Sequence, residues 1–298
     1  MNYSNSCPVA MQTQPEYDPP HVTSLAQSLR IAQWRMCLLH SAPQHRLIWL
    51  TQGQGRALID TRRRGIGAHN LIFLPAGHLF ALDAGPPPMG HILSVPPGHA
   101  GNWPVWPSLA RALDVREQGE ITALFDAMSR EQSMQRSGWA DAMGALSQLM
   151  AVWLIRVNEG HLLADGSGAP LKDAATHDTA ADRLIGAFLS DLERLYPQGA
   201  PMASYAERLD VTATHLSRVC KARLGRSASE LIVERTLHAA RDRLETTSTP
   251  VKDIAAGLGF RSAAYFSRFI QSHTGNSPRA LRKRAREATE RARQTAAS

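Results

Sequence analysis

The last third of this chain contains a two-helix pattern that occurs twice. The first copy is Ala206-x-x-Leu209-x-Val211 followed by Leu216-Ser217-Arg218-Val219. The second copy is Ala255-x-x-Leu258-x-Phe260 followed by Phe266-Ser267-Arg268-Phe269. Each copy predicts a short helix, a tight turn and a second helix that carries a Ser-Arg pair. A unit repeated in this way indicates two equivalent tasks performed side by side.

The residues between the two helices of each copy have the chemistry of a turn and a helix start. Asp210 and Gly259 occupy the turns, where a residue that tolerates left-handed backbone geometry is needed. Thr212 and Ser262 then stand where N-caps of the second helices are expected. In the second copy, the spacing predicts that four residues face inward: Tyr265, Phe266, Phe269 and Ile270.

A longer helix is predicted between the copies, over residues 228–245. Ser227 and Glu230 have the spacing of a capping box at its start. About 18 residues at ~1.5 Å each give a rod of about 27 Å. One turn of B-DNA is about 34 Å long, so this rod can place two recognition helices in successive segments of the major groove. We therefore expect both copies to insert a helix into DNA.

The distribution of charge supports a polyanionic partner for this part of the chain. Residues 201–298 carry 18 Lys and Arg against 9 Asp and Glu, whereas the whole chain carries 33 against 26. The net charge of +7 therefore comes entirely from the last third, and the rest of the chain is slightly acidic. Such asymmetry is typical of a nucleic-acid-binding domain joined to a domain with another task.

The region before the repeat favours β structure. From about residue 29 to residue 97, short apolar runs alternate with Gly, Pro and polar turns, and no helical pattern separates them. This spacing predicts an antiparallel sandwich or a small barrel, which can enclose one ligand. The expected fold class is α+β and multidomain: an antiparallel β-barrel with a pair of amphipathic helices, then an all-α domain of about seven helices. The run Arg62-Arg63-Arg64 is expected at a solvated hairpin tip.

The pair of helices is predicted over residues 116–157, where apolar residues recur at helical spacing. The second helix has a wide apolar stripe that includes Leu149, Met150 and Trp153. Two interpretations stay open: the stripe mediates dimerisation, or it simply covers the barrel.

Composition divides the chain into five segments: a disordered tail (1–22), the barrel with its helical pair (23–157), a linker (158–178), the helical domain (179–285) and a basic tail (286–298). No signal peptide and no apolar run of about 20 residues is recognised, so we expect no membrane association. Three cysteines without metal-ligand spacing fit a reducing cytosol.

A barrel of this kind can hold a small molecule or a metal ion. Five side chains are candidates for lining an apolar effector pocket: Trp34, Trp49, Phe73, His78 and Phe80. The alternative for the aromatic residues is that they form the plain hydrophobic core. The histidines at 69, 78, 91 and 99 are scattered rather than clustered. We therefore expect no metal and no cofactor.

Several of these motifs resemble those of a known family. The segments Asp253-Ile-Ala-x-Gly-Leu-Gly-Phe260, Tyr265-Phe-Ser-Arg268-Phe and Gly275-Asn-Ser-Pro278 resemble the signature of the AraC/XylS family of transcriptional regulators. His215-Leu-Ser-Arg218 and Gly225-Arg-Ser-Ala228 match it in the first copy. The segments Gly55-Arg-Ala-Leu-Ile-Asp60 and Phe73-Leu-Pro-Ala-Gly77-His78 look like the cupin-type sensor domain of AraC regulators.

The resemblance implies which side chains contact DNA. Outward residues of the recognition helices would meet base edges: Thr214, Ser217 and Arg218 in the first, and Ala263, Ala264, Ser267 and Arg268 in the second. Candidate phosphate contacts are Lys221, Arg226, Arg279 and Arg282. Because Ala264 stands where the first copy has Thr214, the first helix is expected to carry more of the base readout.

The sequence thus predicts a sequence-specific, ligand-responsive transcription activator rather than an enzyme. Its expected partners are double-stranded DNA, RNA polymerase, a small-molecule effector and a second copy of the chain. Its expected place is the bacterial cytoplasm, on the nucleoid. Two alternatives stay open: a cupin metalloenzyme fused to a DNA-binding domain, and a constitutive regulator whose barrel is purely structural.

Overall fold

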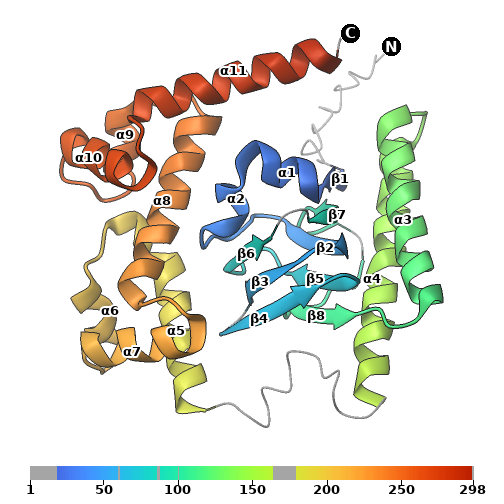
Figure 1. Ribbon diagram of the computed structural model, residues 1–298, viewed down its shortest axis with the longest axis horizontal. Helices are drawn as coiled ribbons and strands as arrows, with labels where there is room; N and C mark the ends of the chain where they lie inside the picture. The colour runs from blue at the N-terminus through green and yellow to red at the C-terminus, as the bar shows by residue number, and fades with distance from the viewer. Residues whose placement is uncertain (1–18, 60, 86–87, 100, 164–178, 297–298) are drawn as a thin grey trace, which may run out of the picture.

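The computed structural model describes residues 19–59, 61–85, 88–99, 101–163 and 179–296 (Figure 1). Most of the predicted tail (1–22) and linker (158–178) lies outside these residues. At the described ends, strand β1 (His21–Ser24) already includes residues 21 and 22, and helix α4 (Trp139–Leu163) continues beyond residue 157.

The N-terminal domain contains two antiparallel sheets. The five-stranded sheet has the order β1-β7-β2-β5-β8, and the three-stranded sheet has the order β4-β3-β6. The remaining strands are β2 (His45–Gln52), β3 (Gln54–Ile59), β4 (Arg62–Gly67), β5 (Asn70–Leu74), β6 (Phe80–Ala84), β7 (Met89–Val95) and β8 (Ser108–Arg111). These two sheets confirm the antiparallel, β-rich domain that the sequence predicts.

The two sheets do not close into a barrel, so that part of the expectation is wrong. Closure requires edge strands long enough to pair across the gap with a continuous stagger. The edge strands β1 and β8 have only four residues each. The chain leaves β1 directly into helix α1 (Leu25–Ala32), because Ser24 is also the N-cap of that helix. The domain is therefore a sandwich of two open sheets.

The space between the sheets is filled with side chains. Ile48, Ile72 and Ile92 point inward from the five-stranded sheet, and Ile59 and Leu82 meet them from the other sheet. Alternate residues of the same strands face the opposite way, as the two-residue period of a strand requires. This arrangement gives the domain a packed interior.

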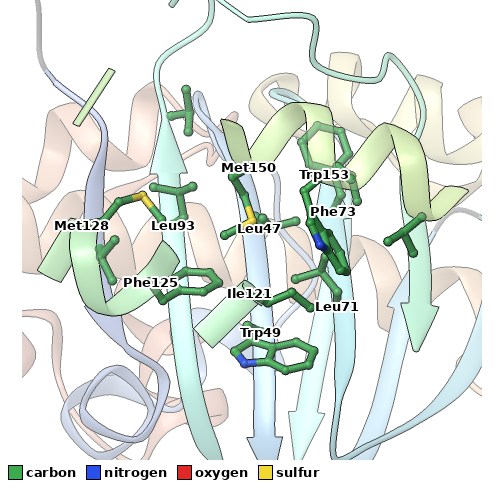
Figure 2. Packing of buried hydrophobic residues seen from close by; sticks show 14 of the residues in the cluster. Leu47, Trp49, Leu71, Phe73, Leu93, Ile121, Phe125, Met128, Met150 and Trp153 are labelled. Carbon is green, nitrogen blue, oxygen red and sulfur yellow. The ribbon is translucent and has the colours of Figure 1, made fainter. Parts of the chain in front are cut away.

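The outer face of the larger sheet is covered by helices α3 (Val115–Met134) and α4 (Figures 1 and 2). Figure 2 shows Trp49 and Phe73 on the sheet, with Phe125 from α3 and Met150 from α4 packed over them. The predicted helical pair is thus present, and its buried stripe covers the sheet.

One segment of α4, Trp139–Val157, is long and apolar enough to span a membrane by length and composition alone. Its mean hydropathy is 1.2, and 44% of the segment is buried inside the protein. Met143, Met150 and Leu154 are completely buried against the sheet, which is the pattern of a core helix. The apolar composition of this segment therefore has a packing explanation.

Residues 179–296 are all helical apart from short connections. The helices are α5 (Ala180–Leu195), the 3₁₀ turn η2 (Tyr196–Gln198), α6 (Met202–Arg208), α7 (Ala213–Leu224), α8 (Ala228–Thr246), α9 (Val251–Ala256), α10 (Ala263–Thr274) and α11 (Pro278–Ala296). The expected all-α domain is confirmed. Helix α11 continues to Ala296, so much of the predicted basic tail (286–298) is helical.

The sandwich lies between the α3–α4 pair and the helical domain (Figure 1). Helices α2 (Trp34–Cys37) and α8 meet at this interface, where Arg35 pairs with Asp242 at 3.0 Å. Arg62 pairs with Asp182 of α5 at 3.1 Å, so the Arg62–Arg64 run is not a solvated hairpin tip. These arginines lie on strand β4, which packs against α7. The expectation is wrong because their partners lie far away in the sequence.

Candidate nucleic-acid interface

The first two-helix unit is formed by α6 and α7. Asp210 has the left-handed geometry (φ 52°) that the turn requires. The backbone N–H of Val211 then donates to the carbonyl of Ala206 at 3.0 Å, and Ala206 is buried at the helix crossing. The Thr212 hydroxyl accepts from the N–H of His215 at 3.1 Å and so caps α7.

The second unit, α9 and α10, repeats these bonds. Gly259 takes the left-handed turn position (φ 73°), and Phe260 N–H donates to the carbonyl of Ala255 at 3.0 Å. The Ser262 hydroxyl accepts from Tyr265 N–H at 3.1 Å. The repeat seen in the sequence therefore extends to the same hydrogen bonds. Both units are helix-turn-helix motifs.

Close backbone contact fixes the second unit against the start of the first. Gly199, after η2, and Gly259 lie so near each other that a Cβ on Gly259 would overlap the backbone of Gln198 and Gly199. Tyr196 bridges the two cores of the domain, and the Arg235 guanidinium lies 3.7 Å from its ring centroid. Arg235 also forms two hydrogen bonds to Glu193 at 2.6 and 2.9 Å. The separation of the two motifs is therefore set by rigid contacts.

The side chains expected to meet DNA lie on accessible faces of the two recognition helices. Thr214, Arg218, Ala264 and Arg268 are exposed, and the remaining three (Ser217, Ala263 and Ser267) are partly exposed. The Ser267 hydroxyl donates to the Ala263 carbonyl at 2.8 Å, which leaves its lone pairs to accept a further bond. The structure thus brings each predicted set together on one surface of its helix.

One orientation expected on α10 is wrong. Phe266 and Ile270 are completely buried, but Tyr265 is 58% exposed. Its ring lies beside the Arg268 guanidinium, whose Cζ is 5.8 Å from the ring centroid. Residues 265 and 268 are three apart and therefore neighbours on the outer face of the helix. Because tyrosine is largely apolar, the sequence pattern predicts an inward orientation instead.

The candidate phosphate contacts have different surroundings. Lys221 is exposed, with Glu230 at 3.4 Å, and Arg279 is exposed without an ion pair among the described residues. Arg226 is ion-paired with Glu234 and is only 28% exposed. Arg282 donates to the carbonyls of Leu244 and Thr249 at 3.3 and 2.5 Å, where it caps the end of α8. Lys221 and Arg279 are therefore the most available of the four for phosphate.

Two acidic groups beside the first motif, Glu234 and Asp182, have shifted pKa values. Burial is the largest influence on the pKa of Glu234 and raises it, whereas Arg226 opposes that rise. Burial would also raise the pKa of Asp182, but bonds from Thr179 and Arg62 lower it below its ordinary value. A charged Asp182 lies near Arg223 of α7 at 3.9 Å, so this carboxylate joins the first motif to strand β4.

The five candidate effector residues are not brought together. Trp49 and Phe73 are buried beneath α3 and α4, whereas Phe80 lies between the sheets. His78 lines a cavity of about 410 Å³ between the N-terminal domain and α5. Trp34 faces α8, where the Arg241 guanidinium lies 4.3 Å from its ring. Nothing in the sequence pattern distinguished these four environments.

Larger hollows lie at the edges of the sandwich. One of about 820 Å³ opens beside Arg56, Asp83 and Arg111. Another, of about 900 Å³, lies between helices α1 and α2 on one side and helices α8 and α11 on the other, and its lining includes Ile31 and Arg284. Within the described residues, no three His, Cys, Asp or Glu side chains gather in a way that could hold a metal ion.

Comparison with known proteins agrees with both domains. Residues 21–152 match the AraC-like ligand binding domain, and residues 205–284 match a helix-turn-helix domain. The chain is 25% identical over 186 residues to the arabinose operon regulatory protein of Salmonella typhimurium, covering 60% of this chain and 61% of that protein. It is 33% identical over 81 residues to the uncharacterized HTH-type transcriptional regulator YfiF of Bacillus subtilis, covering 27% of this chain and 26% of the relative.

The matched segments thus span about a quarter and three fifths of these two relatives. Among solved structures, the fatty-acid-bound ToxT of Vibrio cholerae aligns over 90% of this chain and 97% of its own, with 15% identity and a TM-score of 0.42. That TM-score is low, so the assignment rests on the two domain matches and the arabinose regulator. The chain belongs to the AraC family of transcriptional regulators, with an AraC-like ligand-binding domain followed by a helix-turn-helix domain.

Proposed function

We propose that this protein regulates transcription by binding a specific DNA site with α7 and α10 in successive segments of the major groove. The observation that carries the proposal is the doubled motif: two recognition helices with the same caps, accessible outer faces and a fixed separation. Helix α8 has 19 residues, about 28 Å at ~1.5 Å each, which suits the ~34 Å turn of B-DNA.

The proposed base contacts are the outward residues of the two helices. In α7, Thr214, Ser217 and Arg218 can all form hydrogen bonds, and an arginine can bind guanine with two of them. In α10, Ala263 and Ala264 offer only methyl groups beside Ser267 and Arg268, which suits apolar contact with thymine. Lys221 and Arg279 would contact phosphates. The first helix is therefore proposed to supply most of the hydrogen-bonded readout.

The N-terminal domain is proposed to bind a small-molecule effector, as the description of its matching domain suggests. Arg62 of β4 and Arg223 of α7 both approach Asp182 of α5. A movement of the sandwich would therefore change these contacts and could move the first motif. Members of this family are regulators, which removes the metalloenzyme alternative. A constitutive regulator would bind no effector, and a thermal-shift screen of metabolites separates the two, because a bound ligand raises the unfolding temperature.

We also propose a dimeric state, a protein partner and a cellular location. Exposed apolar residues on α4 (Leu149 at 50% and Val152 at 41%) support a homodimer through the α3–α4 pair. An activator of this kind would also contact RNA polymerase. The protein would act in the bacterial cytoplasm, on the nucleoid.

The contact assignment is tested by DNA-binding titrations of the full chain on a site selected from genomic fragments. We expect Arg218→Ala and Arg268→Ala each to weaken binding by about 1–3 kcal/mol where the contact is to a base. Arg130→Ala is the matched control, because Arg130 is also an exposed arginine but lies on α3. Unchanged affinity in both recognition-helix variants contradicts the assignment.

A further inference from the structure

Both recognition helices carry a ring at the same position. His215 is the third residue of α7 and Tyr265 is the third residue of α10. The backbone N–H of each donates to the hydroxyl of its N-cap residue, Thr212 or Ser262, at 3.1 Å in both cases. The cap therefore fixes the point from which each ring leaves its helix.

In both helices the ring contacts the arginine that follows three residues later. Arg218 Nη2 lies 3.3 Å from His215 Nδ1. Because arginine can only donate, Nδ1 of the imidazole accepts this bond. Arg268 Cζ lies 5.8 Å from the centroid of the Tyr265 ring, within the range of a cation–π contact. The same pairing is thus made by two different kinds of ring.

Packing of the domain does not account for these rings. His215 is exposed, and Tyr265 is 58% exposed although its neighbour Phe266 is completely buried. The Tyr265 ring is tilted by 48° against that of Phe260, with the two centroids 6.0 Å apart. At a surface that binds a partner, such an exposed ring can hold the neighbouring arginine in place for that partner.

We propose that His215 and Tyr265 are positioning residues that hold the guanidinium groups of Arg218 and Arg268 in place for DNA. The proposal rests on the function proposed above. A free arginine side chain has many rotamers, and a contact made before binding reduces the entropy that binding must remove. Each ring would therefore increase affinity through its arginine.

The two rings act differently because their chemistry differs. The hydrogen bond to His215 Nδ1 has a direction, so it fixes both the position of Arg218 and the rotation of its planar group. The face of Tyr265 attracts a cation without fixing its rotation. Arg218 is thus prepared for bidentate recognition of one base, and Arg268 for a contact that tolerates several sequences.

The test for α7 combines variants of His215 and Arg218 on the selected site and on the same site with one base pair changed beneath α7. We expect His215→Ala to weaken binding about fivefold and to reduce discrimination between the two sites, because one hydrogen bond to the arginine is lost. His215→Asn should restore both, since its side-chain oxygen can accept at a position close to that of Nδ1. In an Arg218→Ala background, His215→Ala should have no further effect.

The test for α10 uses Tyr265→Ala and Tyr265→Phe. The alanine variant should weaken binding about two- to fivefold on all sites alike, whereas the phenylalanine variant keeps the ring face and should bind normally. Thermal unfolding of each variant shows whether the domain is intact; the exposed positions should leave it unchanged.

The outcomes separate this inference from the proposed function. If Arg218→Ala weakens binding but His215→Ala does not, or if His215→Ala acts equally with and without Arg218, the positioning role is overturned while the proposed function stands. If Arg218→Ala and Arg268→Ala both leave binding unchanged, the contact assignment itself fails, and the pairing loses its purpose.

Discussion

At the scale of single residues, Gly259 shows how tightly the second motif is constrained. Its backbone is left-handed (φ 73°), and a Cβ would overlap the backbone of Gln198 and Gly199. We expect Gly259→Ala to lower the free energy of unfolding by roughly 2 kcal/mol or more, since strain and overlap add together. Denaturant titration measures this directly.

Gly119→Ala is the matched control for that substitution. Gly119 lies within α3, and nothing lies within 4 Å of a Cβ built there. Alanine is the better helix former, so the control should gain about 0.5–1 kcal/mol. Equal effects of the two substitutions would show that the contact between Gly199 and Gly259 does not hold the motifs together.

Turn and cap residues are the features of this domain that can be predicted most reliably from the sequence. The predicted turn residues and helix caps are confirmed: Asp210 and Gly259 lie in the turns, and Thr212 and Ser262 cap the second helices. They can be predicted because turn and cap chemistry depends on neighbours a few residues away. The exposure of Tyr265 could not be predicted in the same way. An aromatic residue at a boundary between faces is assigned by its apolarity, and only the packed neighbours decide which side it takes.

At the scale of elements, helices α3 and α4 have two faces with different tasks. The inner face is buried on the sheet, whereas Leu149 and Val152 stay exposed. If the outer face joins two copies, Leu149→Glu and Val152→Glu should shift the protein to monomer, because each places a charge in an apolar contact. Analytical ultracentrifugation measures the shift.

The control for that experiment is Ile31→Glu. Ile31 is 67% exposed on α1, away from the α3–α4 pair. It should leave the oligomeric state unchanged. A protein that is monomeric before any substitution, or a dimer that survives both charges, would exclude dimerisation through α4.

The helices could be predicted from the sequence, but the open arrangement of the two sheets could not. Helical periodicity gave α3, α4 and the seven-helix plan, since each depends on its own local pattern. Barrel closure depends on strands β1 and β8, which belong to opposite edges of one sheet. Their shortness matters only when the whole sheet is assembled, so turns and strand spacing alone could not reveal the open sandwich.

At the scale of the whole molecule, a histidine pair lies buried where the two domains meet. His40 of the N-terminal domain stacks on His238 of α8, with ring centroids 4.2 Å apart. Burial, followed by the nearby Arg235, lowers the pKa of His238 to about 3. Burial also lowers the pKa of His40 well below its ordinary value, and His238 and Arg46 lower it further. Both rings are therefore neutral in the folded protein near pH 7.

The sign of the pH dependence follows from these lowered values. An unfolded histidine takes up a proton near pH 6.5, whereas folded His238 does so only near pH 3. Between these values the unfolded chain binds more protons, so stability should fall as the pH is lowered, by up to about 1.4 kcal/mol per pH unit for each such histidine. Unfolding measured from pH 7 to pH 4.5 should show the loss, and His238→Gln should reduce its slope. An identical slope in that variant would contradict a neutral, buried His238.

In the proposed complex, the two recognition helices of one chain occupy successive segments of the major groove. This arrangement can be tested by hydroxyl-radical and methylation-protection footprinting of the full chain on its selected site. We expect two protected major-groove segments about 10 base pairs apart, of which Arg218→Ala weakens one and Arg268→Ala the other. A single protected segment that is insensitive to one of the two arginines would contradict it.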